Sequence, residues 1–202
     1  MEVNVSASCV VVSVVEDVHV ADASLDPARE LMSERRATFS AFVESRLGDL
    51  YRLASVILGD PVEAQDAVHD ALERAWRGWG QLQDAARLDA WVSRILVNEC
   101  RDRLRQRRRR PVTDISDMLS ASLSGPDDLR AAIDRDELGR AFAALGPDHQ
   151  IAIVLRFYAD LTVDQIAMRV GAPAGTVKSR LHHALAAMNA ELARTGAREA
   201  IR

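Results

Sequence analysis

Six side chains that can donate hydrogen bonds crowd into eight residues near the C-terminal end of the chain. We call them the donor face: Thr176, Lys178, Ser179, Arg180, His182 and His183. Hydroxyl, ammonium, guanidinium and imidazole groups bind phosphate oxygens and the acceptor atoms of base edges. Apolar residues recur between them at three- and four-residue steps, which predicts a helix with the donors outward. The inward residues would be Val177, Leu181, Ala184, Leu185 and Met188.

The residues before the donor face predict a second helix and a tight turn. Thr162 and Gln165 form a capping-box pattern that starts a helix, with Ile166, Ala167 and Val170 on its apolar face. Gly171 ends this helix, and Pro173 suits the first turn of the next. Residues 161–192 therefore predict a helix-turn-helix, a motif whose second helix lies in the major groove of DNA. The alternative is a helical hairpin with a solvated polar face.

A second group of donors lies on a helix that starts near Asp89. Four arginines and one asparagine fall within roughly 80° of arc at 100° per residue, opposite the apolar residues. We call them the basic stripe: Arg94, Asn98, Arg101, Arg105 and Arg108. Arginines hold phosphates, and an asparagine can pair with a base edge. Trp91 lies beside the stripe, either in the core or as a stacking platform for a base.

An acidic strip marks the preceding helix. Phe39 to Leu58 form a first apolar stripe, and Gly59 ends that helix. Asp60 caps the next helix, with Pro61 at its first position. The outer face of this second helix is the acidic strip: Gln65, Asp66, His69, Asp70 and Glu73. It is either a solvated face or a docking surface for a basic partner.

The composition is that of a soluble globular protein. The chain of 202 residues is 48% hydrophobic and 28% charged, and its 4% aromatic content favours helices. A net charge of −4 would argue against nucleic-acid binding if the charged residues were spread evenly along the chain. Residues 1–35 hold seven acids and two arginines, whereas the basic block of residues 101–110 is local, and local patches set the field that a polyanion meets.

Several classes of function are excluded by what the sequence lacks. No apolar run approaches the roughly 20 residues of a membrane helix. Cys9 and Cys100 lie far apart, so there is no disulfide framework, which fits a reducing cytoplasm. No cysteine or acid completes a metal site with His149, His182 or His183. We find no catalytic constellation either, so we expect no enzyme, no metal, no cofactor and no small-molecule substrate.

Helix-breaking residues and a loss of helical periodicity divide the chain into two small helical domains, so we expect an all-α protein. Residues 36–110 form the first domain and residues 129–194 the second. The serine-rich segment 111–128, with Gly125 and Pro126, reads as a flexible linker of at most about 60 Å. Residues 1–35 are expected to be a disordered or wrongly started extension, with Met32 as a plausible start, and residues 195–202 a frayed tail.

Three motifs in order resemble the extracytoplasmic-function, or group IV, sigma factors of bacterial RNA polymerase. DPVEAQDAVHDALERAW resembles the core-binding helix of that family, and DAWVSRILVNECRDRLRQRRR resembles its promoter-melting helix. LGPDHQIAIVLRFYADLTVDQIAMRVGAPAGTVKSRLHHAL resembles its C-terminal helix-turn-helix. The resemblance covers about residues 36–194. It implies a DNA-binding subunit that joins core RNA polymerase, recognises promoter DNA and is commonly held inactive by an anti-sigma factor, without direct insertion into a membrane.

The resemblance also implies roles for particular residues. Asp66, His69 and Asp70 match the acidic helix that docks on the polymerase. Asn98 matches the residue that captures a base flipped from the minus-ten element, and the loop 80–88 matches the pocket for that base. The donor face matches the contacts to the minus-thirty-five element, with Thr176 and Arg180 on phosphates. His69 and His183 stand where the family more often has glutamine and arginine.

Two other classes of function compete with this interpretation. One is a free-standing transcriptional regulator that uses the helix-turn-helix alone, with residues 36–109 as a sensor or dimerisation bundle. The other is an adaptor whose acidic and basic faces bind other proteins. The basic stripe favours the promoter-specificity subunit, because a sensor domain has no need of a nucleic-acid face.

Overall fold

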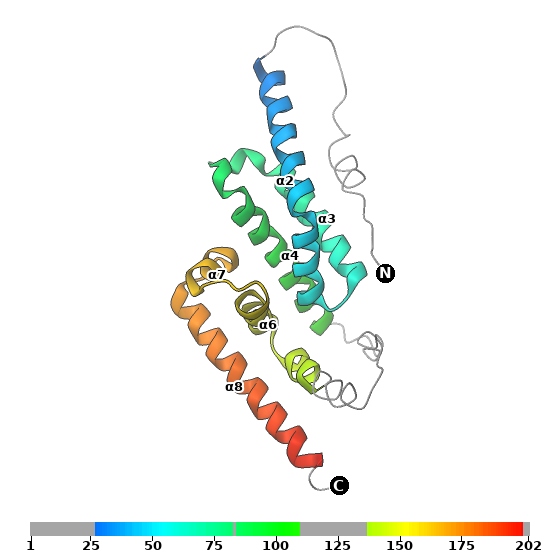
Figure 1. Cartoon of the computed structure of the whole chain (residues 1–202), viewed down its shortest axis with the longest axis vertical. Helices are drawn as coiled ribbons and strands as arrows, with labels where there is room; N and C mark the ends of the chain where they lie inside the picture. The colour runs from blue at the N-terminus through cyan, green and yellow to red at the C-terminus, as the bar shows by residue number, and fades with distance from the viewer. Residues whose placement is uncertain (1–26, 83, 110–136, 200–202) are drawn as a thin grey trace.

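The computed structural model describes residues 27–82, 84–109 and 137–199, and in these ranges the backbone is helical with short turns and without strands (Figure 1). The prediction of an all-α protein is confirmed. The elements in chain order are α2 (Pro27–Leu58), α3 (Pro61–Arg77), the 3₁₀ turns Trp79–Gln81 and Ala85–Arg87, α4 (Leu88–Arg109), a helix over 137–144, α6 (Pro147–Ile153), the π-helix η3 (Val154–Tyr158), α7 (Val163–Val170) and α8 (Ala174–Glu199).

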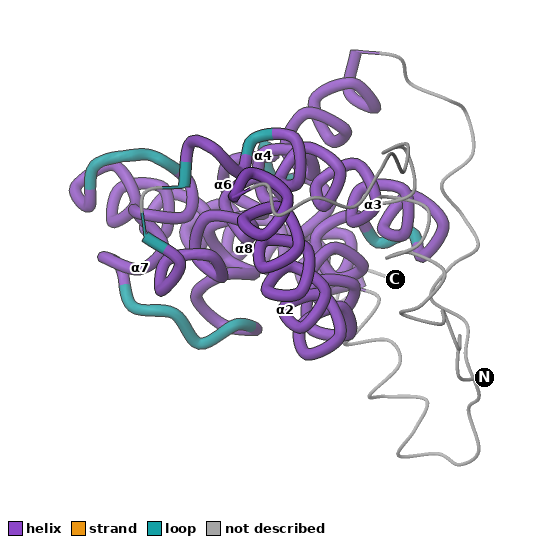
Figure 2. Tube along the Cα trace, turned by 90° about the horizontal axis from the view of Figure 1, so that it is seen from above, coloured by secondary structure: helices purple, strands orange, loops and turns teal. Residues whose placement is uncertain are grey.

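The first three helices pack on one another as the N-terminal body, residues 27–109 (Figure 2). Gly59 ends α2 in the left-handed conformation at φ 68°, which glycine adopts without strain. The Asp60 carboxylate then accepts hydrogen bonds from the backbone N–H groups of Val62 and Glu63, as its capping position predicts. The core of this body comes from the predicted apolar stripes, with Phe39, Leu72 and Leu96 among its largest fully buried side chains.

The C-terminal body, residues 137–199, holds the predicted helix-turn-helix in α7 and α8. Both hydrogen bonds of the capping box are present, because the Thr162 hydroxyl accepts from the Gln165 N–H and the Gln165 side chain accepts from the Thr162 N–H. Gly171 ends α7 at φ 65°. Helix 137–144 packs on α8 through a small separate cluster of Ala141, Leu145, Ala184 and Met188.

Four details of the helices differ from the expectation. α2 begins at Pro27, so residues 27–35 belong to this helix rather than to an N-terminal extension. α8 continues through Glu199 instead of fraying from residue 195. Tyr158 is 50% exposed, because the π-helix η3 has a wider turn that rotates it out of the 3.6-residue face. Leu185 is 42% exposed, because the contact stripe of α8 is narrow. Residues 1–26 and the linker 111–128 lie outside the described residues.

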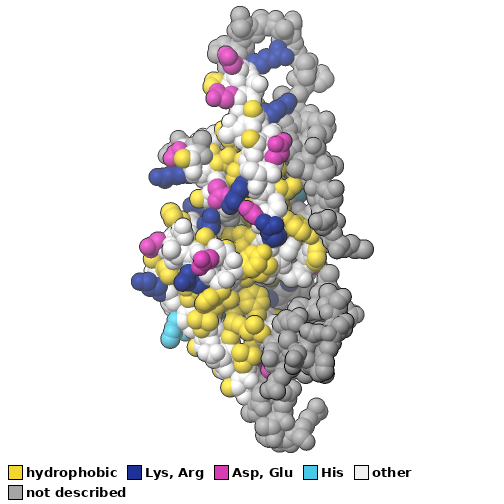
Figure 3. Space-filling view, viewed as in Figure 1, with side chains coloured by type: hydrophobic (Ala, Val, Ile, Leu, Met, Phe, Trp, Pro, Cys, Tyr) yellow, Lys and Arg dark blue, Asp and Glu magenta, His cyan; other side chains and the backbone are white. Residues whose placement is uncertain are grey.

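The two bodies touch along α4, and their apolar cores join. α7 and α6 both contact α4, and one buried cluster contains α4 residues together with Leu155, Ile166, Val170 and Val177. In Figure 3, hydrophobic side chains gather across the middle of the visible face, and charged side chains lie mainly above and to the left of them. The sequence predicts the bodies but gives no sign that they meet.

Replacing Gly171 by alanine should destabilise the helix-turn-helix by about 1–2 kcal/mol, since an L-residue pays roughly that to adopt the left-handed conformation. The added Cβ would also lie 3.0 Å from an Arg94 nitrogen. Thermal unfolding followed by circular dichroism measures the effect. The control is Gly175→Ala, because a Cβ at Gly175 in the first turn of α8 meets nothing within 4 Å. An equal fall in Tm for both variants would contradict the strain argument.

Candidate nucleic-acid interface

The donor face lies on the first three turns of α8 and is open to solvent. Lys178, Ser179, His182, His183 and Thr176 are all exposed. The Ser179 hydroxyl lies 3.2 Å from His183 Nδ1, and the two imidazole rings are 5.6 Å apart in an edge arrangement. The turn at Gly171 fixes α8 against α7. The five exposed donors of α8 can therefore enter the groove of a DNA duplex.

Arg180 differs from the rest of the donor face. It is half-buried, and its guanidinium lies 3.5 Å from the Asp148 carboxylate of α6. In this conformation Arg180 is therefore turned toward the inside of the C-terminal body rather than outward with Lys178.

The basic stripe lies along α4 and faces the C-terminal body. Asn98 accepts a hydrogen bond of 2.8 Å from Arg101. Arg101 in turn lies 3.1 Å from Asp148 and donates to the Val170 carbonyl, and its side chain is only 13% exposed. Arg105 lies 3.0 Å from the other oxygen of Asp148. The C-terminal body therefore covers Arg101 and partly covers Asn98, whereas Arg94, Arg105 and Arg108 remain exposed.

Burial affects the chemistry of the innermost arginine. Desolvation lowers the pKa of the Arg101 guanidinium from its ordinary value, and the Asp148 carboxylate acts in the opposite direction. An arginine keeps its charge under all ordinary conditions, so this cation needs acceptors around it. Arg94, at the start of the stripe, stays exposed and packs over Gly171 at the turn of the helix-turn-helix.

Trp91 packs on the apolar core instead of standing out from α4. Its ring lies against Gly78 at the end of α3, 3.4 Å from where a Cβ would be. The core interpretation fits this position better than the stacking interpretation does.

The acidic strip runs along α3 and is partly occupied. Gln65 and Asp66 are exposed, and His69, Asp70 and Glu73 are half-buried. Asp70 accepts a hydrogen bond from Arg103 of α4, and Glu73 accepts one from Arg77 one turn along. Asp66 is thus the acid of the strip that is most open to a partner.

Two carboxylates that pattern reasoning does not single out organise the arginines. Glu99 is buried between α3 and α4, where it lies 2.6 Å from Arg74 and 3.5 Å from Arg103. The Asp148 carboxylate forms ion pairs with the guanidinium groups of Arg101, Arg105 and Arg180. Glu99 falls on the apolar side of α4. An acidic residue at such a core position is the one feature of the sequence that could have indicated a buried ion pair.

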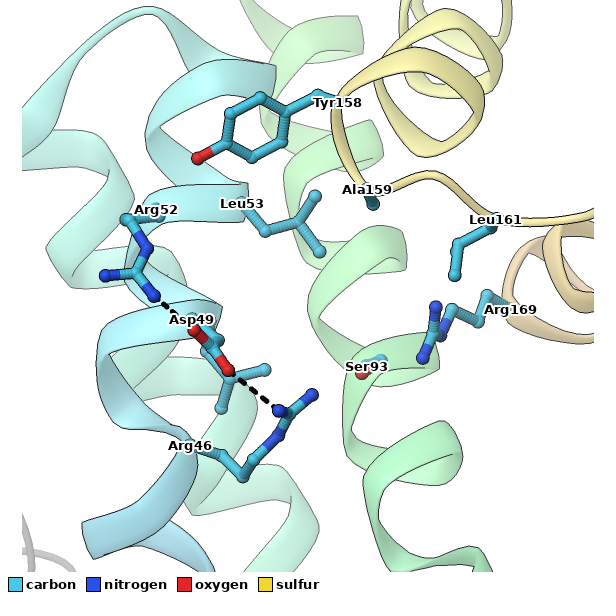
Figure 4. A pocket seen from close by; sticks show the side chains of 10 residues that line it. Arg46, Asp49, Arg52, Leu53, Ser93, Tyr158, Ala159, Leu161 and Arg169 are labelled. Carbon is cyan, nitrogen blue, oxygen red and sulfur yellow. Dashed lines mark hydrogen bonds and ion pairs between the residues drawn. The ribbon is translucent and has the colours of Figure 1, made fainter.

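A third carboxylate marks the opposite edge of the contact between the bodies. Asp89, in the first turn of α4, lies 2.8 Å from Arg46 of α2 and 3.3 Å from Arg169 of α7. Beside it is a groove of about 250 Å³ lined by α2, α4 and the segment from Tyr158 to Arg169, in which Arg46 and Arg52 both bind Asp49 (Figure 4). The guanidinium groups that line this groove are already paired with the carboxylates of Asp49 and Asp89.

The described part of the chain contains no group of three histidine, cysteine or acidic side chains that could hold a metal ion. None of the helices in the described ranges is long and apolar enough to cross a membrane. Burial raises the pKa of the Cys100 thiol to about 12, so this thiol stays protonated and unreactive at neutral pH.

Comparison with known proteins identifies both bodies. Residues 42–110 match the family model for Sigma-70 region 2, and residues 135–188 match the model for Sigma-70, region 4. ECF RNA polymerase sigma factor SigL of Mycobacterium tuberculosis is 34% identical over 162 residues, which span 79% of this chain and 92% of SigL. RNA polymerase sigma-E factor of Streptomyces coelicolor is 32% identical over 154 residues, spanning 76% of this chain and 85% of that protein.

A solved structure shares the fold. The sigma factor RpoE of Bartonella quintana, crystallised with the anti-sigma factor NepR, superposes with a TM-score of 0.53. The match covers 81% of this chain and 97% of RpoE, at 24% sequence identity. It supports the helical architecture of both bodies.

Proposed function

Because this chain belongs to the extracytoplasmic-function branch of the sigma-70 family, we propose that it recognises duplex promoter DNA with α8 and melted promoter DNA with α4. As a sigma factor it binds core RNA polymerase and directs transcription to promoters. The family is not a family of enzymes. Because the chain belongs to this family, the promoter-specificity interpretation is preferred to the free-standing regulator and to the adaptor protein.

The residue-level proposal rests on one observation. The donor face is exposed on the second helix of a helix-turn-helix, and local geometry fixes the turn between the two helices. The capping box and the left-handed Gly171 set the angle between α7 and α8. Lys178, Ser179 and His182 are then exposed together on the second helix, which is the helix that enters a major groove in this motif. We assign the duplex contacts to the minus-thirty-five element to Thr176, Lys178, Ser179, Arg180, His182 and His183.

The second DNA contact is assigned to α4. A single strand binds through arginines that hold its phosphates and through side chains that pair with a displaced base. Arg94, Asn98, Arg101 and Arg105 supply these groups, and we assign the pocket for the displaced base to the loop 80–88, which precedes α4 in the chain. Trp91 packs against Gly78 at the end of α3, a position that suits a supporting role in the core better than stacking on a base.

Domain bounds and control complete the proposal. We place the region 2 domain at residues 36–110 with the helical extension back to Pro27, and the region 4 domain at residues 129–194. The relative RpoE is crystallised with an anti-sigma factor, and we propose that an anti-sigma factor also controls this chain, in the cytoplasm where RNA polymerase works.

The proposal is tested by reconstitution. Purified protein is mixed with core RNA polymerase from the same source and with a library of promoter fragments, and run-off transcripts are sequenced. We expect co-elution with the core enzyme and initiation at defined starts that share two spaced elements. Transcription without a shared upstream element would contradict the assignment of α8, and transcription without a shared downstream element would contradict that of α4.

Reversing the charge of Asp66 should lower the affinity for core polymerase by about tenfold or more, since like charges brought together at an interface cost several kcal/mol. Asp66→Lys is compared with Glu44→Lys, which makes the same charge change at an exposed position of α2 outside the acidic strip. Fluorescence anisotropy with labelled core enzyme measures both. Equal losses would assign the effect to net charge, and no loss for Asp66→Lys would remove the acidic strip from the interface.

A further inference from the structure

One arginine of α2 joins the end of α3 to the start of the loop 80–88. The guanidinium carbon of Arg35 lies 4.6 Å from the centroid of the Trp76 ring and 5.5 Å from that of the Trp79 ring. Arg35 also donates a hydrogen bond to the backbone carbonyl of Trp76. Trp76 belongs to the last turn of α3, and Trp79 begins the 3₁₀ turn Trp79–Gln81. A single side chain therefore spans the point where α3 ends and the loop begins.

A buried phenylalanine fixes the two tryptophan rings beside this arginine. Phe39, one turn after Arg35 on α2, is 1% exposed. Its ring centroid is 5.3 Å from that of Trp76 and 5.9 Å from that of Trp79, the second pair in an edge-on arrangement. The centroids of the two tryptophan rings are 6.5 Å apart. Aromatic rings attract one another over these distances, so the three rings form a packed surface against which Arg35 lies.

The charge of Arg35 is compensated by the rings and by a carbonyl. Desolvation by burial lowers the pKa of the Arg35 guanidinium, but an arginine keeps its charge under ordinary conditions. Its Nε atom is buried and has no hydrogen-bond partner among the described residues. The face of a tryptophan ring attracts a cation, and the carbonyls in the last turn of a helix carry a partial negative charge. Trp76 supplies both, so the positions of the arginine and the rings depend on each other.

The far end of the loop returns to the same place. Trp91, in the first turn of α4, packs against Gly78, where an added Cβ would lie 3.4 Å from its ring and 3.1 Å from the Arg74 carbonyl. Gly78 directly precedes Trp79 in the chain. The loop thus starts and ends beside one aromatic cluster, and a displacement of Trp79 would change its shape.

The part of α2 that supplies this contact lies outside the segment matched by the family model. That match begins at residue 42, whereas α2 begins at Pro27. Residues 27–35, which the sequence analysis assigns to an extension, therefore contribute a side chain to the loop of the proposed region 2 domain.

We propose that Arg35 is a positioning residue for the minus-ten pocket: it fixes Trp79, and thereby the start of the loop 80–88, in the conformation that receives the displaced base. In this role Arg35 acts through Trp79 rather than on DNA. The role rests on the proposed function of the loop, whereas the contact between Arg35 and the tryptophan rings does not. Loss of Arg35 loosens the loop in the free protein and weakens the choice of base at one position of the downstream element, without affecting recognition by α8.

The first test follows the tryptophans of the full chain by fluorine NMR. The three tryptophans of the sequence are replaced by 5-fluorotryptophan, and each resonance is assigned with a tryptophan-to-phenylalanine variant. We expect Arg35→Met to shift and broaden the Trp79 resonance, because methionine keeps an apolar side chain without the charge or the donor. Arg36→Met removes the same charge at the next, exposed position of α2 and should leave that resonance unchanged. An unmoved Trp79 resonance in Arg35→Met, or an equal shift in Arg36→Met, would overturn the proposal.

The second test measures base preference with reconstituted holoenzyme and a promoter library. We expect Arg35→Met to flatten the preference at one position of the downstream element by about two- to fivefold, the factor that one cation–π contact at a partly exposed site is worth. The preference in the upstream element should stay parental. Arg35→Lys keeps the charge but lacks the planar group that covers both rings, so its effect should be smaller than that of Arg35→Met and in the same direction.

The controls separate positioning from folding and from the proposed function itself. Circular dichroism checks that Arg35→Met keeps its helices; if that variant unfolds, Arg35→Lys takes its place in both tests. Equal flattening of both promoter elements would indicate a general loss of structure and overturn the proposal. Asn98→Ala is the reference: an effect of Asn98→Ala on the downstream element without one of Arg35→Met would refute the role of Arg35. No effect of either variant would refute the single-strand assignment of α4 and, with it, the role that depends on it.

Discussion

Replacing Asn98 by alanine is expected to lower the yield of open promoter complexes by about tenfold, while duplex binding through α8 stays at the parental level. A bidentate contact between an amide side chain and a base edge is worth about 1–3 kcal/mol, which spans roughly five- to more than a hundredfold in an equilibrium. Unstacking a base costs a few kcal/mol, so the loss of one partner for the displaced base shifts a finely balanced step. Permanganate reactivity of unpaired thymines measures the open complex.

The position of Asn98 makes this substitution specific. Its amide is half-buried on the stripe of α4 and accepts a hydrogen bond from Arg101 of the same helix. A matched control is Asn189→Ala, which removes the same amide from an exposed position far along α8. Gel mobility shift with a duplex that carries only the upstream element measures duplex binding. Equal loss of duplex and open-complex binding in Asn98→Ala would show that its effect is structural.

The elements that the sequence predicts well are those specified by local chemistry. Asp60 caps α3 through its own neighbours, and the Thr162 and Gln165 side chains bond only to each other's backbone. Gly59 and Gly171 each supply a left-handed turn at the end of a helix. Each of these interactions spans a few residues, so residue type and spacing determine it without knowledge of the fold.

The contacts that escaped prediction join residues far apart in the chain. Arg105 and Asp148 are 43 residues apart, and Arg169 and Asp89 are 80 residues apart. Periodicity tells which face of α4 carries its arginines, but a solvated stripe, a DNA-bound stripe and a stripe paired with another helix have the same spacing. The π-helix η3 is a further case, because one wider turn moves Tyr158 to the surface without any special residue type.

Replacing Lys178 by alanine should weaken upstream-element binding and flatten the base preference at one position of that element by about tenfold. Lys178 is exposed in the first turns of α8, beside Ser179 and one turn before His182. A lysine in the major groove binds the O6 and N7 acceptors of guanine, and such a contact is worth about 1–3 kcal/mol of discrimination. Selection of promoter libraries with reconstituted holoenzyme measures the preference at each position.

The same substitution distinguishes base recognition from phosphate binding. If Lys178 contacts a base, its loss changes the preference at one position, and His182→Ala changes it at a neighbouring position. If Lys178 contacts a phosphate, all sequences weaken alike and the salt dependence falls by about one unit. Lys178→Arg is the matched variant, since it keeps the charge but reaches further with a planar group. A preference that stays unchanged in Lys178→Ala, with a reduced salt dependence, would assign this side chain to the DNA backbone and leave base recognition to the histidines of the donor face.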